Sequence, residues 1–124
     1  MKLQPDPQSA LNTVTRYEDD HIEINAVKFN HSLLVMPEGK IETWAVYSFE
    51  DLLESHFLQI SEKRPELVIF GSGSKIRFPN PTLLKPILQL RIGIETMDTQ
   101  AACRTYNILM GEGRKVLGAF LIGN

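Results

Sequence analysis

A glycine-rich loop, Gly71-Ser72-Gly73, directly follows a run of four large apolar residues at positions 67–70. Such a run is typical of a strand that is buried on both faces. Open α/β sheets bind their ligands in the crevice at the carboxyl ends of their strands, where this loop would lie. The loop is therefore the first candidate binding site in the chain.

The loop does not complete a known phosphate-binding or nucleophile motif. A dinucleotide fingerprint needs a third glycine where Ile76 stands, and the Gly-Lys-Ser/Thr order of a P-loop is absent. Ser72 and Ser74 do not lie in a Gly-x-Ser-x-Gly elbow, because Lys75 occupies its last place. Glu95 ends the next predicted strand, where a ribose-binding acid would lie, so dinucleotide binding stays open as an alternative. A turn that lets two elements approach closely is the favoured interpretation.

The other reactive side chains show no catalytic or metal-binding spacing. His21, His31 and His56 share no metal-ligand spacing with one another or with Cys103. We expect the histidines to be surface residues and Cys103 to be a small core residue. The sequence therefore predicts no catalytic residue, no metal and no cofactor.

Polar side chains gather around one short predicted helix between two buried strands, over residues 95–114. Arg104 and Asn107 lie three apart and so share a face of that helix. In the structural interpretation Asp98 and Thr99 cap the helix, and Arg104 pairs with a nearby carboxylate. In the functional interpretation these groups line the crevice opened by the glycine loop. The candidate ligand- or partner-binding residues are Gly71, Ser72, Gly73, Glu95, Asp98, Thr99, Arg104, Asn107 and Arg114.

The second half of the chain alternates between strand and helix patterns. Strands are predicted at 67–70, 92–97 and 116–122, with one helix starting near Thr82 and another capped by Asp98 or Thr99. We expect the first of these helices to pack on more than one side, and Gly93 to end it in a left-handed conformation. The alternation predicts βαβ units and a mostly parallel sheet.

The first half predicts an antiparallel ribbon and one helix. Residues 21–29 alternate as a strand, with a bulge or a strand end near Val27, and extended segments follow at 32–36 and 41–46. Ser48 and Asp51 are spaced as a capping box that opens a helix continuing to Pro65, with Tyr47 as its hydrophobic staple. Residues 1–15 are predicted to be a mobile tail, and residues 16–124 a single domain.

Composition excludes several classes of protein. The 124 residues suffice for one domain, and a net charge of −2 gives no basic footprint for nucleic acid. A single cysteine cannot form an intrachain disulfide, which is typical of a reducing compartment. The chain has no signal-peptide pattern and no stretch of ~18 apolar residues that would predict a membrane span. We therefore expect a cytoplasmic protein.

Linked motifs run through the second half of the chain. In chain order they are Gly71-x-Gly73, Gly93-Ile94-Glu95, Met97-Asp98-Thr99-x-x-Ala102, Thr105-Tyr106-Asn107-x-Leu109 and Glu112-Gly113-Arg114. As a set they resemble the Mth-type domain family, and the similarity covers roughly residues 22–122. That family includes a mitochondrial assembly factor for respiratory complex I and the adipogenesis-associated Mth-domain protein.

The resemblance implies a three-layer α/β domain with a mixed central sheet, helices on its faces and an added N-terminal antiparallel β layer. It implies no reaction, and for bacterial members it implies an association with respiratory-complex or membrane-protein biogenesis. The absence of a mitochondrial targeting pattern favours a bacterial protein. We therefore expect a non-enzymatic binding or assembly module with a protein partner, such as respiratory-complex or translocation subunits. The alternative is a small-molecule-binding protein or enzyme at the glycine loop, with Glu95 or Asp98 as acid or base.

Overall fold

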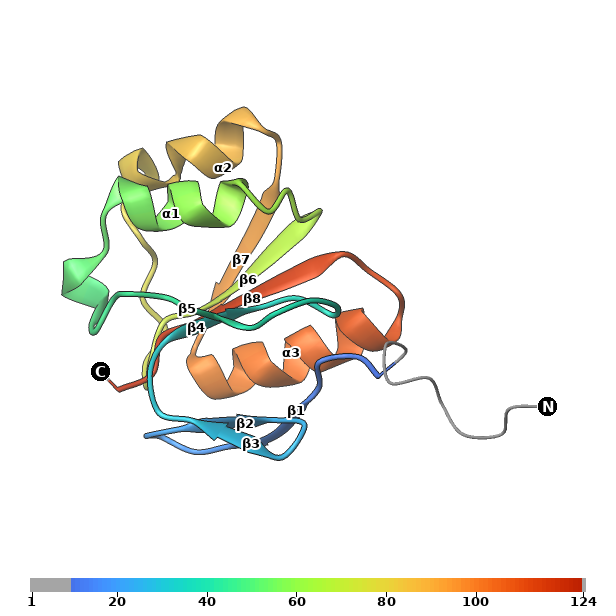
Figure 1. The fold of residues 1–124 in the computed structure, drawn as a ribbon. Helices are drawn as coiled ribbons and strands as arrows, with labels where there is room; N and C mark the ends of the chain where they lie inside the picture. The colour runs from blue at the N-terminus through green and yellow to red at the C-terminus, as the bar shows by residue number, and fades with distance from the viewer. Residues whose placement is uncertain (1–9, 124) are drawn as a thin grey trace.

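The structure is a computed structural model that describes residues 10–123. A five-stranded sheet forms its centre, with the strand order β5-β4-β8-β6-β7 (Figure 1). Strands β8, β6 and β7 run parallel, whereas β4 pairs antiparallel with both β8 and β5. The sheet is therefore mixed, as expected. The strand bounds are β4 Leu33–Val35, β5 Glu42–Thr43, β6 Leu67–Gly71, β7 Gly93–Met97 and β8 Val116–Phe120.

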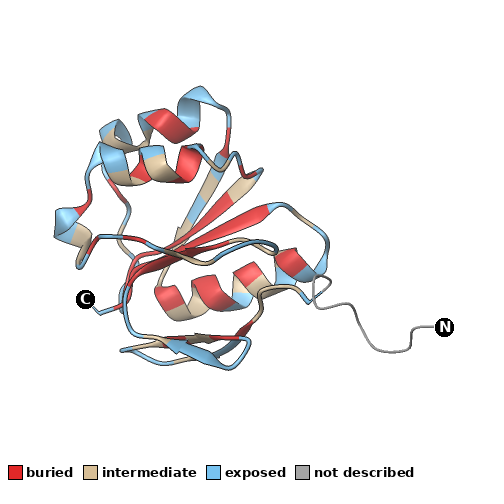
Figure 2. Ribbon diagram, in the orientation of Figure 1, coloured by how far each residue is buried: buried red, intermediate tan, exposed pale blue. Residues whose placement is uncertain are grey.

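Strand β6 lies between two parallel neighbours and is the buried strand that the sequence predicts. Leu67 is in register with Gly93 of β7 on one side and with Val116 of β8 on the other. Ile69 and Phe70 are fully buried, and Figure 2 shows burial along this part of the sheet. The glycine loop consequently begins at the carboxyl end of the sheet.

Helices cover both faces of the sheet (Figure 1). Helices α1 and α2 pack on one face, and their core joins Trp44, Phe57 and Phe70 in edge-to-face contacts. Helix α3 packs on the other face, where Tyr106 meets Phe120 edge to face. The helices are α1 Glu54–Ser61, α2 Lys85–Gln89 and α3 Thr99–Gly111, with 3-10 turns η2 Phe49–Asp51 and η3 Pro81–Leu84.

A separate three-stranded antiparallel sheet lies under α3, so that α3 is enclosed between two sheets (Figure 1). Its strands are β1 (Val14–Tyr17), β2 (Ile22–Ile24) and β3 (Val27–Phe29), called the ribbon below. Val14, Ile22 and Ile24 belong to the same buried core as the α3 residues. This is the antiparallel β layer that the sequence and the family resemblance predict.

Of the two interpretations of residues 21–29, the bulge is wrong and the strand end is closer, because β2 ends at Ile24 and β3 begins at Val27. Asn25 and Ala26 have φ values of 50° and 69° and turn the chain between β2 and β3. Two consecutive residues with positive φ make a tight hairpin turn, which alternation of side chains does not reveal. Strand β1 also begins at the buried Val14, inside the segment predicted to be a mobile tail. Residues 1–9 of that segment lie outside the described residues.

The prediction of one helix from Ser48 is also wrong. The Ser48 Oγ donates a hydrogen bond to the Asp51 carboxylate over 3.0 Å and caps no backbone N–H. The chain then becomes extended at the buried Leu52, and α1 begins only at Glu54. Tyr47 is 85% exposed and therefore makes no hydrophobic staple.

The helix before β7 differs from its prediction in two details. Its start is as expected, because Asn80 caps η3 and Pro86 lies in the first turn of α2. However, Leu88 is 52% exposed, so the helix packs on one side only. Arg91, with φ of 58°, makes the left-handed exit that was predicted for Gly93.

Candidate functional site

The glycine loop fits closely against the first turn of α3. A Cβ atom on Gly71 would lie 2.9 Å from Thr99 Cα and 3.1 Å from Ala102 Cβ. Only glycine leaves room for this approach of strand to helix. Gly71 is therefore a packing residue, as the favoured sequence interpretation proposed.

The hydroxyl of Thr99 ties the loop to two elements. Thr99 Oγ1 accepts a hydrogen bond from the Gly73 N–H over 2.9 Å and donates one to the Leu121 carbonyl over 2.8 Å. The Thr99 N–H donates to the Gly73 carbonyl over 2.9 Å. All three residues are buried, and the bonds between them use the Thr99 hydroxyl as both donor and acceptor.

Ser72 is fully buried and holds the segment that follows the loop. Its hydroxyl donates to the Lys75 carbonyl over 2.6 Å and accepts from the Arg77 N–H over 3.0 Å. Its own N–H donates to the Met97 carbonyl over 2.9 Å. Since both functions of the hydroxyl are used and the atom is buried, Ser72 is not placed to act as a nucleophile.

Asp98, like the candidate residues Gly73 and Thr99, lines a hollow. Its carboxylate caps α3 by accepting a hydrogen bond from the Ala101 N–H over 2.9 Å. The hollow has a volume of about 220 Å³. We call it the acidic hollow; its lining is Glu18, Asp19, Gly73, Ser74, Asp98, Thr99, Gln100, Leu121, Ile122 and Gly123.

Arg104 and Asn107 face the ribbon. The Asn107 side chain accepts from the Val14 N–H over 3.0 Å and donates to the Val14 carbonyl over 2.8 Å. Arg104 Nη1 donates to the Tyr17 hydroxyl over 3.3 Å, and its guanidinium lies 5.9 Å from the Tyr17 ring centroid. The shared helix face predicted for these two residues therefore holds β1 in place.

The structure does not bring Glu95 and Arg114 to the glycine loop. Glu95 is exposed on β7, which is an edge strand of the five-stranded sheet. Arg114 precedes β8 at the opposite end of the sheet, where its Nε donates to Glu66 over 3.0 Å. Two hydrogen bonds hold the pKa of the Glu66 carboxyl below its usual range. The bond from the Lys115 N–H has the larger effect, and the bond from Arg114 has the smaller one.

His56 and Cys103 have structural rather than catalytic roles in the fold. His56 Nδ1 accepts from the Leu53 N–H over 2.9 Å, at the start of α1. Burial raises the pKa of the Cys103 thiol to about 12, so little of it is thiolate at neutral pH. Between residues 10 and 123, no three His, Cys, Asp or Glu side chains are grouped in a way that could hold a metal ion.

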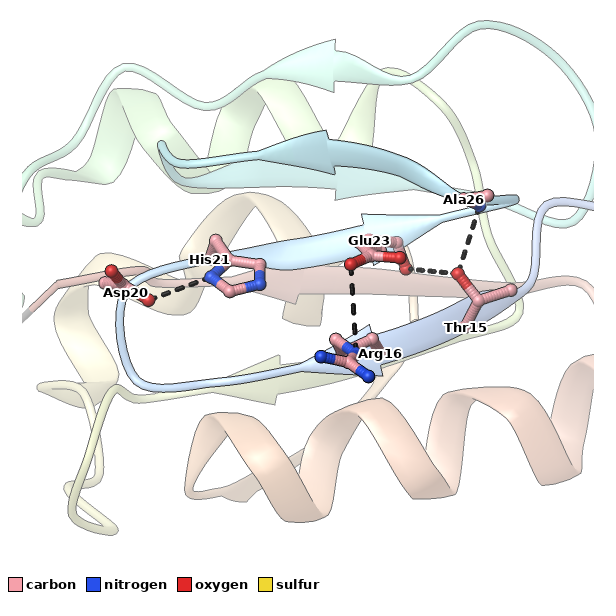
Figure 3. A network of polar contacts seen from close by, with 6 residues as sticks. All are labelled: Thr15, Arg16, Asp20, His21, Glu23 and Ala26. Carbon is pink, nitrogen blue, oxygen red and sulfur yellow. Dashed lines mark hydrogen bonds and ion pairs between the residues drawn. The ribbon is translucent and has the colours of Figure 1, made fainter.

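Figure 3 shows His21 beside Asp20 at the turn between β1 and β2, and the His21 side chain is only 14% exposed, which is less than expected for a surface residue. Its Nδ1 lies 2.8 Å from Asp20 Oδ1, and this hydrogen bond lowers the pKa of the Asp20 carboxyl. Nearby, the Thr15 hydroxyl accepts from the Ala26 N–H over 3.1 Å. These contacts join neighbouring strands and turns and do not assemble a reactive centre.

Comparison with known proteins places the chain in a family. Residues 14–121 match the family described as "Protein of unknown function (DUF498/DUF598)". The chain belongs to this family. A protein of known crystal structure from Bordetella parapertussis is 44% identical, with a TM-score of 0.87 over 94% of this chain and 99% of that one. A Bordetella pertussis protein described as a Mth938-like domain is 38% identical, with a TM-score of 0.83 over 100% and 94% of the two chains.

The match confirms the predicted Mth-type resemblance and fold class. Among curated relatives, the bovine "NADH dehydrogenase [ubiquinone] 1 alpha subcomplex assembly factor 3" is 32% identical over 111 residues. The alignment covers 88% of this DUF498/DUF598 protein and 59% of the bovine one, so the chain spans little more than half of that relative. The "13 kDa major membrane protein" of Francisella tularensis is 26% identical over 94% of this chain and 95% of its own. Within residues 10–123 no helix has both the length and the apolarity needed to cross a membrane.

One residue of this DUF498/DUF598 domain, Arg77, is absent from the candidate residues of the sequence analysis. The Arg77 guanidinium lies 4.8 Å from the centroid of the Phe49 ring, and its Nη1 pairs with Glu50 over 2.7 Å. Its Nε is buried and has no hydrogen-bond partner among the described residues. The sequence did contain one indication of this role, because Arg77 lies between two large apolar residues, Ile76 and Phe78, in an otherwise polar loop.

Replacing Asn107 with alanine is expected to loosen the ribbon from α3. The substitution removes both hydrogen bonds to Val14, which should lower the free energy of unfolding by about 1–3 kcal/mol. Denaturant unfolding measures that loss, and amide exchange at Val14 should become faster. Thr105→Ala, at a half-buried position of the same helix, is the matched control. Equal stability of the two variants would show that the hydrogen bonds between Asn107 and Val14 do not stabilise the ribbon.

Proposed function

We propose that this protein is a non-catalytic assembly factor that binds a protein partner during the biogenesis of a respiratory complex or another membrane protein. The observation that carries the proposal is the 32% identity to the bovine complex I assembly factor 3, which covers 88% of this chain. Because the chain spans only 59% of that relative, the activity of the whole bovine protein does not transfer directly. The partner class is therefore part of the proposal.

The geometry of the glycine loop supports binding of a protein rather than of a small substrate. The Ser72 hydroxyl and the Thr99 hydroxyl are both used in buried hydrogen bonds. The acidic hollow measures about 220 Å³, whereas pockets for small ligands usually measure about 300–1,000 Å³. A shallow polar rim of this size suits a contact within a larger protein interface.

We place the partner contact on the rim of the acidic hollow, at Asp98 and Arg104. Asp98 is half-buried and Arg104 is exposed, so both can reach a partner, unlike Gly71 or Thr99. Arg104 holds Tyr17, which precedes the acidic residues at the edge of the hollow. The hollow thus offers the carboxylates of Glu18, Asp19 and Asp98. The Arg104 guanidinium lies outside its lining, on the helix that Asp98 caps.

The test is recovery of the tagged protein from its native host after mild cross-linking. Arg104→Ala is expected to reduce partner recovery on the order of tenfold, because exposed arginines at interface centres contribute strongly. Arg114→Ala, at the opposite end of the sheet, is the control and should recover the partner normally. Unchanged recovery with Arg104→Ala would remove the rim from the proposal. We also propose that the protein is located in a bacterial cytoplasm. Fractionation of the same host cells tests this location.

The competing function is a small-molecule site or an enzyme at the acidic hollow, with Asp98 as its acid or base. A ligand that binds only the folded state must raise the melting temperature. A thermal-shift panel of metabolites decides between the two. A ligand whose effect is lost in Asp98→Asn, which keeps a capping oxygen, would favour the small-molecule function.

A further inference from the structure

The segment that follows the glycine loop is held rigidly although its tip is exposed. The Ser72 hydroxyl bonds both the Lys75 carbonyl and the Arg77 N–H. Yet Phe78 is 71% exposed and Ile76 is 53% exposed. Large apolar side chains that are exposed on a preorganised loop bind a partner without the entropic loss of ordering that loop. The buried hydrogen bonds of Ser72 thus hold the segment that exposes Ile76 and Phe78 to solvent.

Arg77 has more hydrogen-bond donors than the described part of the protein satisfies. A guanidinium carries five N–H donors, and Arg77 uses one of them, on Nη1, to bind Glu50. The Nε donor is buried and has no partner among residues 10–123. A buried donor without a partner is unfavourable, so an acceptor that reaches it would stabilise the bound state.

The guanidinium also lines a hollow of about 360 Å³ with mainly apolar walls. We call it the Arg77 hollow; it is lined by Phe49, Glu50, Leu52, Arg77, Pro79, Asn80 and Leu83. The guanidinium carbon lies 4.8 Å from the centroid of the Phe49 ring and makes a cation–π contact with it. This contact fixes the orientation of the charge beside the apolar walls.

We propose that the Arg77 hollow and Phe78 form a docking surface for a protein segment that carries a carboxylate next to an apolar side chain. The proposal rests on the proposed function and specifies the chemistry of its partner. The apolar side chain enters the hollow, and the carboxylate accepts hydrogen bonds from the guanidinium edge that Glu50 does not use. Charge-assisted bonds from arginine to a carboxylate are the strong, directional kind. Arginine and aromatic residues around a desolvated pocket are typical of interface hot spots.

The charges around the hollow decide against nucleic acid as the occupant. Glu50 pairs with Arg77 and lines the hollow, so a polyphosphate backbone would bring several negative charges against this carboxylate. A single partner carboxylate needs only the free edge of one guanidinium. Because Nε is covered by protein atoms, binding must shift the guanidinium slightly for that donor to be reached.

The first experiment uses a defined peptide probe. We would titrate ¹⁵N-labelled protein with acetyl-leucyl-aspartyl-leucinamide and, separately, with its asparaginyl counterpart. The aspartyl peptide is expected to shift the Arg77 Nε–H resonance and the Phe49, Phe78 and Leu83 amides. The asparaginyl peptide should bind about tenfold more weakly, which corresponds to the loss of one charge-assisted contact. No shift at about 10 mM aspartyl peptide, or shifts confined to the acidic hollow, would overturn the proposal.

Matched variants separate binding from folding. Arg77→Gln and Phe78→Ala should each weaken the peptide about tenfold, whereas Arg114→Gln, another arginine paired with a glutamate, should not. Phe78→Ala changes an exposed side chain and should leave the melting temperature unchanged. Arg77→Lys keeps the charge but loses Nε and should bind with intermediate affinity. Equal affinity of all four variants would overturn the proposal.

The host experiment distinguishes failure of this surface from failure of the proposed function. A photo-cross-linking residue in place of Phe78 should capture the assembly partner, whereas one in place of the exposed Val27 of the ribbon should not. Normal recovery of the partner by Arg77→Gln would overturn this docking surface and leave the proposed function intact. If the wild type recovers no partner, the proposed function fails, and the peptide titration still decides the surface. Cross-linking of position 78 only to a second copy of the chain would also overturn the proposal.

Discussion

Gly71→Ala is expected to lower the free energy of unfolding by about 2–3 kcal/mol. The added Cβ would lie 2.9 Å from both the Cα and the Oγ1 atoms of Thr99. The first of these is backbone at the start of α3, so it cannot rotate away as a flexible side chain would. Relief of the clash requires α3 to move from the sheet, which disturbs the core on that face. Urea or thermal unfolding measures the loss.

Gly111→Ala is the matched control for this prediction. Gly111 ends α3, and nothing lies within 4 Å of a Cβ built on it. Alanine also favours a helix over glycine by about 0.5–1 kcal/mol, so this variant should be unchanged or slightly more stable. Equal loss of stability in both variants would show that close packing at Gly71 is not the reason for its glycine.

Thr99→Val should lower the free energy of unfolding by about 2–4 kcal/mol, although valine has nearly the shape of threonine. The substitution leaves the Gly73 N–H and the Leu121 carbonyl without their partner, and both lie in the interior. Each buried group left unpaired is unfavourable by about 1–3 kcal/mol. The loop and the end of β8 should separate from α3, which amide exchange at Gly73 would detect.

Thr99→Ser tests whether the hydroxyl or the methyl group is responsible. Serine keeps both hydrogen bonds and removes one methyl group, whose burial contributes about 0.8 kcal/mol. We therefore expect the serine variant to retain most of the stability and the slow exchange at Gly73. A serine variant as unstable as the valine variant would show that packing of the methyl group dominates.

These two predictions limit what mutagenesis at the glycine loop can reveal about function. Substitutions at Gly71 or Thr99 would reduce partner binding by destabilising the fold, whether or not the loop touches the partner. Exposed residues such as Arg104 and Phe78 are the informative positions, because their side chains can change without leaving buried groups unpaired.

The order of elements in the second half of the chain could be predicted from sequence because its signals are local. The apolar run before Gly71 marked β6, and Asp98 marked the start of α3, whose capping bond spans only three residues. The first half was predicted less well. The turn at Asn25 depends on positive φ angles, and Ser48 bonds a side chain where a backbone cap was expected.

The sequence alone thus determined the α/β order, the family resemblance and the absence of a complete catalytic motif. Tertiary structure alone decided what the polar residues do, because their partners are distant in the chain. Asn107 binds Val14 across 93 positions, and Gly73 binds Thr99 across 26. Arg114 was separated from Asp98 because α3 runs back along the sheet to its opposite end (Figure 1). Arg77 lies against Phe49, a contact that no local spacing encodes, and its Nε is buried without a partner among residues 10–123.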